Sequence, residues 1–290
     1  MDSGAAGQRG GGAAVAQAAN DRPQGADRTP LPRCPAAPPS TWHLWLDETP
    51  RPGWANMAID HALLERAQHQ CESWLRLYHW APPCLSFGRH EPASKRYDLE
   101  RINQLGLDTV RRPTGGRAVW HAEELTYAVA APSERFGSLP AAYLEIHEML
   151  ADALRGLGAS ASLAAPVRTP PVDAGACFSQ PAGGEIMIEG RKVVGSAQLR
   201  QGGAFLQHGS ILLADNQGLV LGLTRSALTA PLSLRSANPF RSQEIAGAIT
   251  KAAESRWPGD WNRVLDSGPV LRTASSFYPH YRSAAWTWAR

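Results

Sequence analysis

Residues 184–213 constrain the fold more than any other stretch of the chain. Three short apolar runs, 184–189, 192–200 and 204–213, are separated there by a Glu-Gly and a Gly-Gly break. Short runs divided by glycine-containing turns are typical of an antiparallel meander. The sequence therefore predicts three consecutive strands that pair as neighbours in one sheet.

The middle run begins at Lys192, one of three lysines in the chain, and continues with the small residues Gly195, Ser196 and Ala197. A lysine ammonium on a flexible stem has a chemistry that a guanidinium cannot supply. Small residues inside a strand indicate that something lies close to the backbone. Either a ligand or a neighbouring helix fits this pattern.

The composition indicates a soluble globular protein with a substantial core, since 43% of the 290 residues are hydrophobic and 19% are charged. A formal charge of +3 does not indicate a nucleic-acid partner. No apolar run approaches the roughly 20 residues of a membrane span, and no secretory signal is recognisable. The four cysteines, 34, 71, 84 and 177, form no C-x-x-C pair. We expect reduced thiols and a cytoplasmic protein without a membrane partner.

Periodicity divides the chain into three parts. Residues 1–40 lack large apolar side chains and predict a disordered tail. Residues 41–257 carry the periodic elements of a catalytic domain, and the aromatic-rich residues 258–290 predict an extension packed on the core. Helices are predicted over 56–70, 97–105, 143–157 and 242–257, and strands over 74–80, 84–88, 108–112, 118–121 and 125–131. A loop is expected over 159–175, and Asp60 is expected off the apolar stripe of the first helix.

Candidate chemical groups are few. Cys177 lies among small residues, 15 positions before Lys192, and a nearby ammonium lowers the pKa of a thiol. A lone cysteine is more often an inert buried residue. His121 and His208 border strands as possible bases, although satisfied core histidines are the simpler interpretation. No metal-binding spacing or phosphate-binding loop occurs.

The glycines of Thr114-Gly115-Gly116 allow close backbone approach to an anion or an acyl carbonyl. A tight hairpin turn is the simpler interpretation of these residues alone.

Two longer motifs contain these residues. Residues 111–119 read RRPTGGRAV and are followed by His121, and residues 190–198 read GRKVVGSAQ and are followed by QHGS at 207–210. The two motifs resemble the signatures of the lipoate/biotin protein ligase and octanoyltransferase superfamily. NMAID at 56–60 and PCLSFG at 83–88 match weaker elements. The similarity extends from about residue 41 to about residue 257.

The resemblance implies an α+β domain with a mixed, largely antiparallel central sheet flanked by helices, as in biotin ligases and class II synthetases. It implies that both signatures line one acyl pocket and that Lys192 contacts the carboxyl or thioester end of the acyl chain. The implied catalytic residues are Cys177 and Lys192. The implied acyl-binding residues are Arg112, Thr114, Gly115, Gly116, Arg117, His121, Gly195, Ser196, Ala197, His208 and Gly209.

Two features imply a branch of the superfamily. Arg117 occupies the place of a third glycine that ATP-dependent lipoate ligases usually carry. Cys177, in the segment GACF, matches the cysteine loop that precedes the lysine strand in octanoyltransferases of the glycine-cleavage H-protein type. The implied activity is transfer of an octanoyl group from octanoyl-acyl carrier protein to a lysine of H-protein or a lipoyl domain, through a cysteine thioester and without a cofactor.

Three other functions stay open. An ATP-dependent lipoate–protein ligase would need ATP and Mg and would leave Cys177 without a role. An amidotransferase would move a lipoyl or octanoyl group between carrier proteins, also through a cysteine. A catalytically silent module would only bind the acyl carrier. Residues 181–184, PAGG, replace a bulkier segment of relatives, so the shape of the acyl pocket stays open as well.

Overall fold

The computed structural model describes residues 41–165, 183–225, 235–236 and 240–289. These residues all belong to one of two units of the chain, residues 33–290. The expected tail (1–40) and Cys177 lie outside the described residues.

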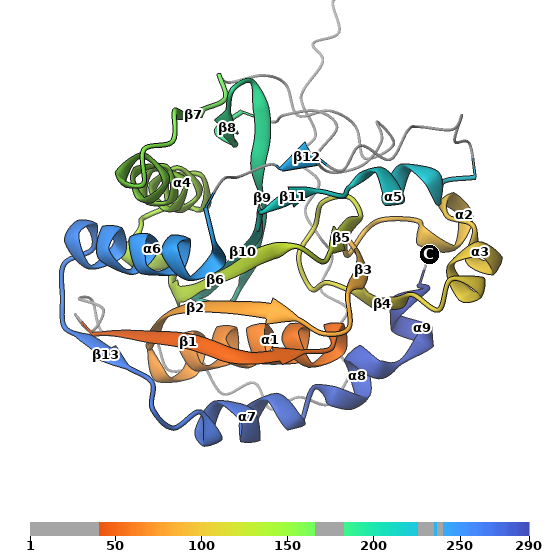
Figure 1. Ribbon diagram of the computed structural model, residues 1–290. Coiled ribbons are helices and arrows are strands. Elements are labelled where there is room, and N and C mark those ends of the chain that lie inside the picture. Colours follow the sequence, from red (N-terminus) through yellow and green to blue (C-terminus); the bar gives the residue numbers. More distant parts are fainter. Residues whose placement is uncertain (1–40, 166–182, 226–234, 237–239, 290) are drawn as a thin grey trace, which may run out of the picture. The chain divides into compact units, whose positions relative to one another are not determined.

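The main sheet has the strand order β13-β1-β2-β6-β10-β9-β8-β7 (Figure 1). The pairs that β1 forms with β2 and β13 are parallel, and the other pairs in this sheet are antiparallel. The expected mixed, largely antiparallel sheet is confirmed. The strands are β1 (Trp42–Arg51), β2 (Ser73–Trp80), β6 (Glu124–Pro132), β7 (Ala161–Leu163), β8 (Ile186–Ile188), β9 (Arg191–Gln201), β10 (Ala204–Leu212) and β13 (Trp261–Arg263).

Shorter elements complete the described chain. A second sheet contains β3 (Cys84–Phe87), β4 (Asp108–Arg111) and β5 (Val119–His121), and β11 (Ala214–Asp215) pairs with β12 (Arg235–Ser236). The helices are α1 (Gly53–Gln70), α2 (Ala93–Arg96), α3 (Leu99–Gln104), the 3-10 turn η1 (Ser133–Arg135), α4 (Leu139–Gly156), α5 (Gly218–Gly222), α6 (Ser242–Arg256), α7 (Gly268–Ser275), α8 (Tyr278–Arg282) and α9 (Ala284–Thr287).

The predicted meander is confirmed, since β8, β9 and β10 are consecutive antiparallel neighbours. In this register Ala197 lies opposite His208, and Ser196 lies opposite Gly209. The loop expected over 159–175 is wrong at Ala161–Leu163, which forms β7 beside β8. Three residues are too few to show a strand period in the sequence.

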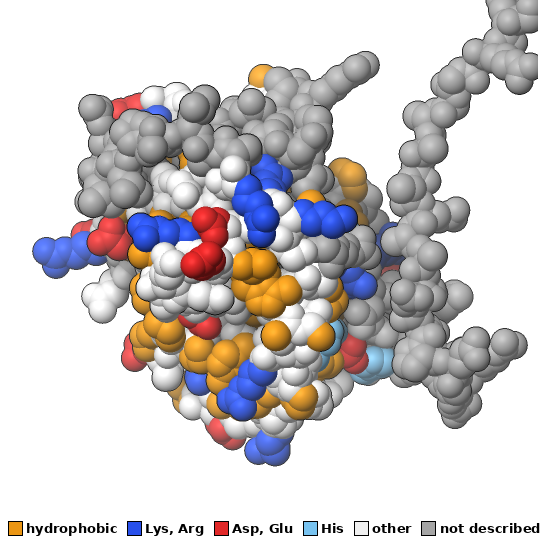
Figure 2. All heavy atoms as spheres, turned by 90° about the vertical axis from the view of Figure 1, so that its right-hand side faces the viewer, with side chains coloured by type: hydrophobic (Ala, Val, Ile, Leu, Met, Phe, Trp, Pro, Cys, Tyr) orange, Lys and Arg blue, Asp and Glu red, His pale blue; other side chains and the backbone are white. Residues whose placement is uncertain are grey.

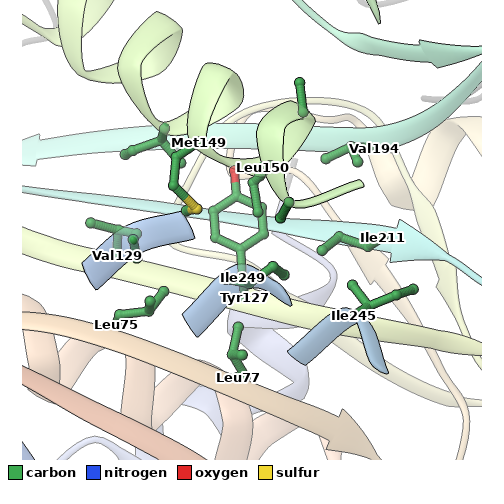
Figure 3. Close-up of a cluster of buried hydrophobic side chains, with 14 of the residues drawn as sticks. Leu75, Leu77, Tyr127, Val129, Met149, Leu150, Val194, Ile211, Ile245 and Ile249 are labelled. Carbon is green, nitrogen blue, oxygen red and sulfur yellow. The ribbon is translucent and has the colours of Figure 1, made fainter. Parts of the chain in front are cut away.

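Two hydrophobic cores lie on opposite faces of the main sheet, because successive side chains of a strand point to opposite faces. Along β6, Tyr127 and Val129 belong to the core under α4 and α6, which Figure 3 shows, whereas Ala128 and Ala130 belong to the core under α1. Each face of the sheet is therefore covered by helices, as expected for this fold class.

Helix α1 begins at Gly53, three residues before the predicted start, where an added Cβ would collide with Cys84 Sγ. Its predicted stripe of Ile59, Leu63 and Ala67 is fully buried. Asp60 is also fully buried, so its expected position off the buried face is wrong. Polar partners on other strands, described below, explain its burial.

The connection between β4 and β5 is not a hairpin. In the smaller sheet β3 lies between β4 and β5, so residues 112–118 cross the end of β3. There the backbone of Gly116 packs directly on Gly88, and a Cβ at Gly88 would collide with the Gly116 carbonyl. The hairpin interpretation of Thr114-Gly115-Gly116 is therefore wrong, and close backbone contact explains the glycine at 88.

The C-terminal residues pack on α1 and on the smaller sheet. Val270, Ala274 and Tyr281 belong to the same core as α1. Arg111 of β4 is fully buried and donates hydrogen bonds to six backbone carbonyls. Their residues are Gly88, Arg89, Glu91, Trp286, Thr287 and Ala289. One guanidinium thus joins the C-terminal segment to the loop that supports Gly116.

The surface near α2, α3 and α5 carries both charge signs. Figure 2 shows Lys and Arg side chains around a small group of hydrophobic ones, with Asp and Glu beside them. None of the helices in the described part of the chain combines the length and hydrophobicity that a bilayer crossing requires.

We expect Arg111→Lys to lower the free energy of unfolding by about 2–4 kcal/mol, because an ammonium cannot reach carbonyls on three sides at once. Urea unfolding of the full chain measures this change. Arg101→Lys on exposed α3 is the matched control and should change stability by less than about 0.5 kcal/mol. Equal effects of the two substitutions would contradict the role of Arg111.

Candidate active site

A pocket lies where the two sequence signatures meet. Residues of α1, β2, β6, β9, β10 and the 112–121 segment surround it. Its lining is Met57, Tyr78, Trp80, Arg112, Gly116, Val119, His121, Thr126, Gly195, Ser196, Ala197, His208, Gly209 and Ser210.

Most of the sequence-predicted binding residues meet in this pocket. Those that line it are Arg112, Gly116, His121, Gly195, Ser196, Ala197, His208 and Gly209. Thr114, Gly115 and Arg117 support it through hydrogen bonds instead. Lys192 is paired with a carboxylate outside this lining, and Cys177 lies outside the described residues.

Small residues give the pocket its floor. Gly195 and Ala197 on β9 leave the space that larger side chains would fill. Gly209 on β10 lies against Ser196 and Tyr127, and a Cβ there would approach Ser196 Oγ to 2.5 Å and Tyr127 Cε1 to 2.8 Å. The helix interpretation of the small residues is confirmed, since His147 of helix α4 (below) contacts Ser196. The ligand interpretation stays a prediction, which the pocket beside Gly195 and Ala197 allows.

A buried network joins His208 to three other parts of the chain. His208 Nδ1 donates to Asp60 Oδ2 at 2.8 Å, and its Nε2 bonds to the Thr114 hydroxyl at 2.6 Å. Asp60 also accepts from Tyr78 at 2.8 Å and from Arg76 at 2.9 Å. Both ring nitrogens of His208 are thus engaged, and the ring holds the first signature against α1.

His121 occupies a second network of the same kind. Its Nδ1 donates to Glu124 Oε1 at 2.7 Å, and its Nε2 lies 2.6 Å from Ser86 Oγ. Burial lowers the pKa of His121, and the nearby Glu124 carboxylate opposes this effect. A neutral ring with its proton on Nδ1 satisfies both partners, because Ser86 then donates to Nε2.

Arg112 closes the glycine loop. Its guanidinium donates to the carbonyls of Gly115 at 3.2 Å and Arg117 at 2.8 Å, and to the carbonyl and hydroxyl of Ser86. Gly116 has φ +91°, a backbone conformation that strains other residues, and an added Cβ would lie 3.3 Å from Arg112 Nη2. This loop therefore has a fixed shape at the pocket wall.

Lys192 lies at the start of β9 and is 8% exposed. Its Nζ contacts Glu185 Oε1 at 2.6 Å, and Glu185 is 5% exposed. A buried ammonium needs such a partner, because desolvation of an isolated charge costs several kcal/mol. The pair therefore fixes the orientation of the Lys192 side chain.

His147 of α4 is a site-adjacent residue that sequence reasoning missed. Its Nε2 lies 2.8 Å from Ser196 Oγ in the pocket wall, and its Nδ1 lies 2.6 Å from the Gly184 carbonyl. Burial is the main cause that lowers the pKa of His147 to about 4, and Lys192 lowers it further. The helix period predicts which face His147 occupies, but it does not reveal the distant residues that this side chain contacts.

Other missed residues fall into two groups. Tyr78, Trp80 and Met57 line the pocket, and a strand or helix pattern does not distinguish them from ordinary core residues. Asp60 and Ser86 lie in the short segments 56–60 and 83–88, whose weak family match was the available signal. In the described ranges, no three His, Cys, Asp or Glu side chains are placed to hold a metal ion.

We expect Gly209→Ala to destabilise the fold by about 1–3 kcal/mol, because the added methyl overpacks against Ser196 and Tyr127. Thermal unfolding checks this. Gly203→Ala, in the β9–β10 turn with open space around it, is the matched control. Similar losses at both positions would contradict tight packing at Gly209.

Stability should depend on pH through His147. The unfolded chain binds a proton on this residue below about pH 6.5, whereas the folded chain does so only below about pH 4. The contribution is therefore complete above pH 6.5 and is lost as the pH falls to 4, by about 3 kcal/mol. His147→Gln should flatten the slope of unfolding free energy against pH in this range. An unchanged slope would show that His147 is not buried in its neutral form.

Known proteins resemble this chain in sequence and in fold. A family model described as the lipoyl protein ligase A/B catalytic domain matches residues 52–232. Octanoyltransferase LipM of Moorella thermoacetica is 43% identical over 185 residues, which are 62% of this chain and 67% of that protein. Octanoyltransferase LipM of Kyrpidia tusciae is 45% identical over 168 residues, 54% and 61% of the two chains. The matches thus span about two thirds or less of these relatives.

Solved structures agree on the fold. A T. acidophilum protein described as a lipoate protein ligase, with bound lipoic acid, has a TM-score of 0.71 and 21% identity over 86% of this chain and all of that one. Lipoate-protein ligase A bound with ATP has a TM-score of 0.70 and 22% identity over 86% and 98% of the two chains. With a matching family model over more than half of its length, this chain belongs to the lipoyl protein ligase A/B catalytic-domain family.

Proposed function

We propose that this chain is a protein octanoyltransferase of lipoate biosynthesis, acting through a thioester on Cys177. It moves an octanoyl group from acyl carrier protein to a lysine of a lipoyl-carrier protein, either glycine-cleavage H-protein or a lipoyl domain. The observation that carries this proposal is that residues of both signatures line one pocket. Relatives 36–45% identical that are named octanoyltransferase support the choice of branch.

The walls of the pocket suit an acyl chain. Met57, Tyr78, Trp80 and Val119 supply apolar surface, and Gly195 and Ala197 leave room beside the backbone. The polar side chains His121 and His208 have both ring nitrogens bonded to protein groups. Burial of an eight-carbon chain is worth roughly 0.8 kcal/mol per methylene, which favours medium chain lengths over very short ones.

The proposed reaction has two steps. The Cys177 thiolate attacks the thioester carbonyl of the octanoyl donor, the C–S bond to the carrier breaks, and the carrier leaves as a thiolate. The amine of the acceptor lysine then attacks the enzyme thioester, and an amide forms as the bond from the carbonyl carbon to Cys177 sulfur breaks. The departing sulfur takes up the proton that the amine loses. A thioester is already activated, so neither step needs ATP or a metal ion.

We assign Lys192 to stabilise the negative charge of the tetrahedral intermediates. Its ammonium is held by Glu185 in a buried environment, where an ionic interaction is stronger than in water. The described residues that flank segment 166–182 support a site near Lys192, because Gly184 N donates to Ala164 O at 2.9 Å. The described residues on either side of this segment thus adjoin Glu185, the partner of Lys192.

Mass spectrometry of the purified chain mixed with octanoyl-acyl carrier protein, without ATP, tests the proposal. We expect an octanoyl adduct on the enzyme that Cys177→Ala abolishes. Cys84→Ala is the control and should keep the adduct, because Cys84 is fully buried, and burial together with Asp108 raises the pKa of its thiol. Loss of the adduct in both variants would contradict a specific role for Cys177.

The same assay separates the other functions. Strict dependence of acyl transfer on ATP would identify a lipoate–protein ligase instead. A donor preference for acylated H-protein over acyl carrier protein would identify an amidotransferase. Binding of the carrier without any adduct would identify a silent binding module.

A further inference from the structure

The imidazole ring of His147 is buried and contacts other parts of the chain. His147 lies on the inner side of α4 and is fully buried. Tyr143, one helical turn earlier, packs on its ring with a centroid distance of 4.0 Å. One ring nitrogen contacts the strand that lines the pocket, and the other contacts the segment that precedes β8.

The partners of His147 define where its proton lies. The Gly184 carbonyl can only accept, so Nδ1 carries the hydrogen and donates to it at 2.6 Å. The unprotonated Nε2 then accepts from Ser196 Oγ at 2.8 Å. A protonated ring would also lie close to the positive charge of Lys192, which opposes protonation.

The hydrogen bonds beyond Ser196 run in one direction. The Ser196 hydroxyl, which donates to His147, accepts from Tyr127 at 2.7 Å, and Tyr127 accepts from Gln207 Nε2 at 2.8 Å. Figure 3 shows Tyr127 pointing from the sheet toward α4. His147 is therefore held by a directed chain that starts on β10 and ends at the Gly184 carbonyl.

The same contacts close a ring around Lys192. Gly184 is followed by Glu185, whose carboxylate pairs with Lys192 at 2.6 Å. Lys192 is followed on β9, four residues later, by Ser196, which bonds to His147. On its other side, the backbone of Glu185 accepts from Ala164 N at 2.7 Å. The hydrogen bond from His147 to Gly184 is therefore one of the contacts that hold the backbone next to this carboxylate.

We propose that His147 is a positioning residue for Lys192: it fixes the Gly184–Glu185 segment against β9, so that the Glu185 carboxylate holds the Lys192 ammonium in place. The catalytic consequence rests on the proposed acyl transfer, whereas the structural consequence for Lys192 does not. His147 itself takes no proton from the substrate, because both of its ring nitrogens are engaged with protein atoms.

Two polar substitutions of similar size test this. In His147→Asn the side-chain amide takes the place of Nδ1 and still donates to Gly184. In His147→Gln the amide reaches toward Ser196, as Nε2 does, and the bond to Gly184 is lost. The test is competitive acetylation of Lys192 against pH, followed by mass spectrometry on the full chain. His147→Gln should speed labelling of Lys192 about tenfold, and His147→Asn should stay within about twofold of the unsubstituted chain.

His61→Gln is the matched control. His61 of α1 is mostly buried against Phe277, and burial lowers its pKa to about 4 as well. This substitution removes a similar histidine from the opposite face of the sheet, so Lys192 labelling should not change. If Lys192 is labelled faster in His61→Gln than in His147→Gln, the effect comes from general loosening of the fold, and the proposal is overturned.

The kinetic readout is separate. With octanoyl donor and acceptor, His147→Gln should lower kcat about tenfold with little change in KM, and His147→Asn should restore most of kcat. Equal labelling and equal kcat in the Asn and Gln variants would overturn the positioning role. If the unsubstituted chain transfers no octanoyl group, the proposed function fails, while the labelling contrast still decides the role of His147.

Discussion

The buried carboxylate of Asp60 joins the parts of the chain that form the pocket. It comes from α1, accepts hydrogen bonds from Arg76 and Tyr78 of β2, and accepts one from His208 of β10. Through His208 it also reaches Thr114 of the first signature. A fully buried carboxylate is tolerable only because these donors replace water, and breaking such a network typically costs 3–5 kcal/mol. The pocket therefore depends on one buried carboxylate that joins a helix to two strands of the sheet.

The second network repeats this design with different residues. Glu124 Oε1 accepts from His121, Thr126 and Ser210, and His121 bonds in turn to Ser86. In both networks a carboxylate orients an imidazole, and the imidazole meets a hydroxyl of the first signature or of strand β3. The two histidines thus fix the pocket wall on two sides. Arg112 connects the second network to the glycine loop, because it donates to both Ser86 and Gly115.

Much of the fold follows from the sequence because its elements carry their own periodicity. The meander of β8, β9 and β10 is defined by glycine-containing turns, and the apolar stripes of α1 and α4 are defined by the helix repeat. The family motifs then place Gly195, His208 and Arg112 in one pocket, as the structure shows. Strand β7 was missed because three residues carry no period, and the hairpin at Gly115 was wrongly expected because local sequence does not reveal that β3 lies between β4 and β5.

The site residues that were missed are those defined by distant partners. Asp60 lies next to Ile59 on the helix and looks solvent-exposed until Arg76 and His208, 16 and 148 residues away in sequence, are brought to it. His147 likewise looks like one more core position of α4. Each such residue is defined by a partner far away in the sequence. A single sequence contains both residues but does not show that they are in contact. Long-range pairing, and not propensity, is the information that was lacking.

The polar groups of the pocket wall are hydrogen-bonded to other protein groups. His208 and His121 engage both ring nitrogens with protein atoms, and Ser196 donates to His147 while it accepts from Tyr127. The thiol of Cys84 is buried, and its pKa is raised by burial and by Asp108. These described groups shape and support the pocket, but none is placed as an activated nucleophile.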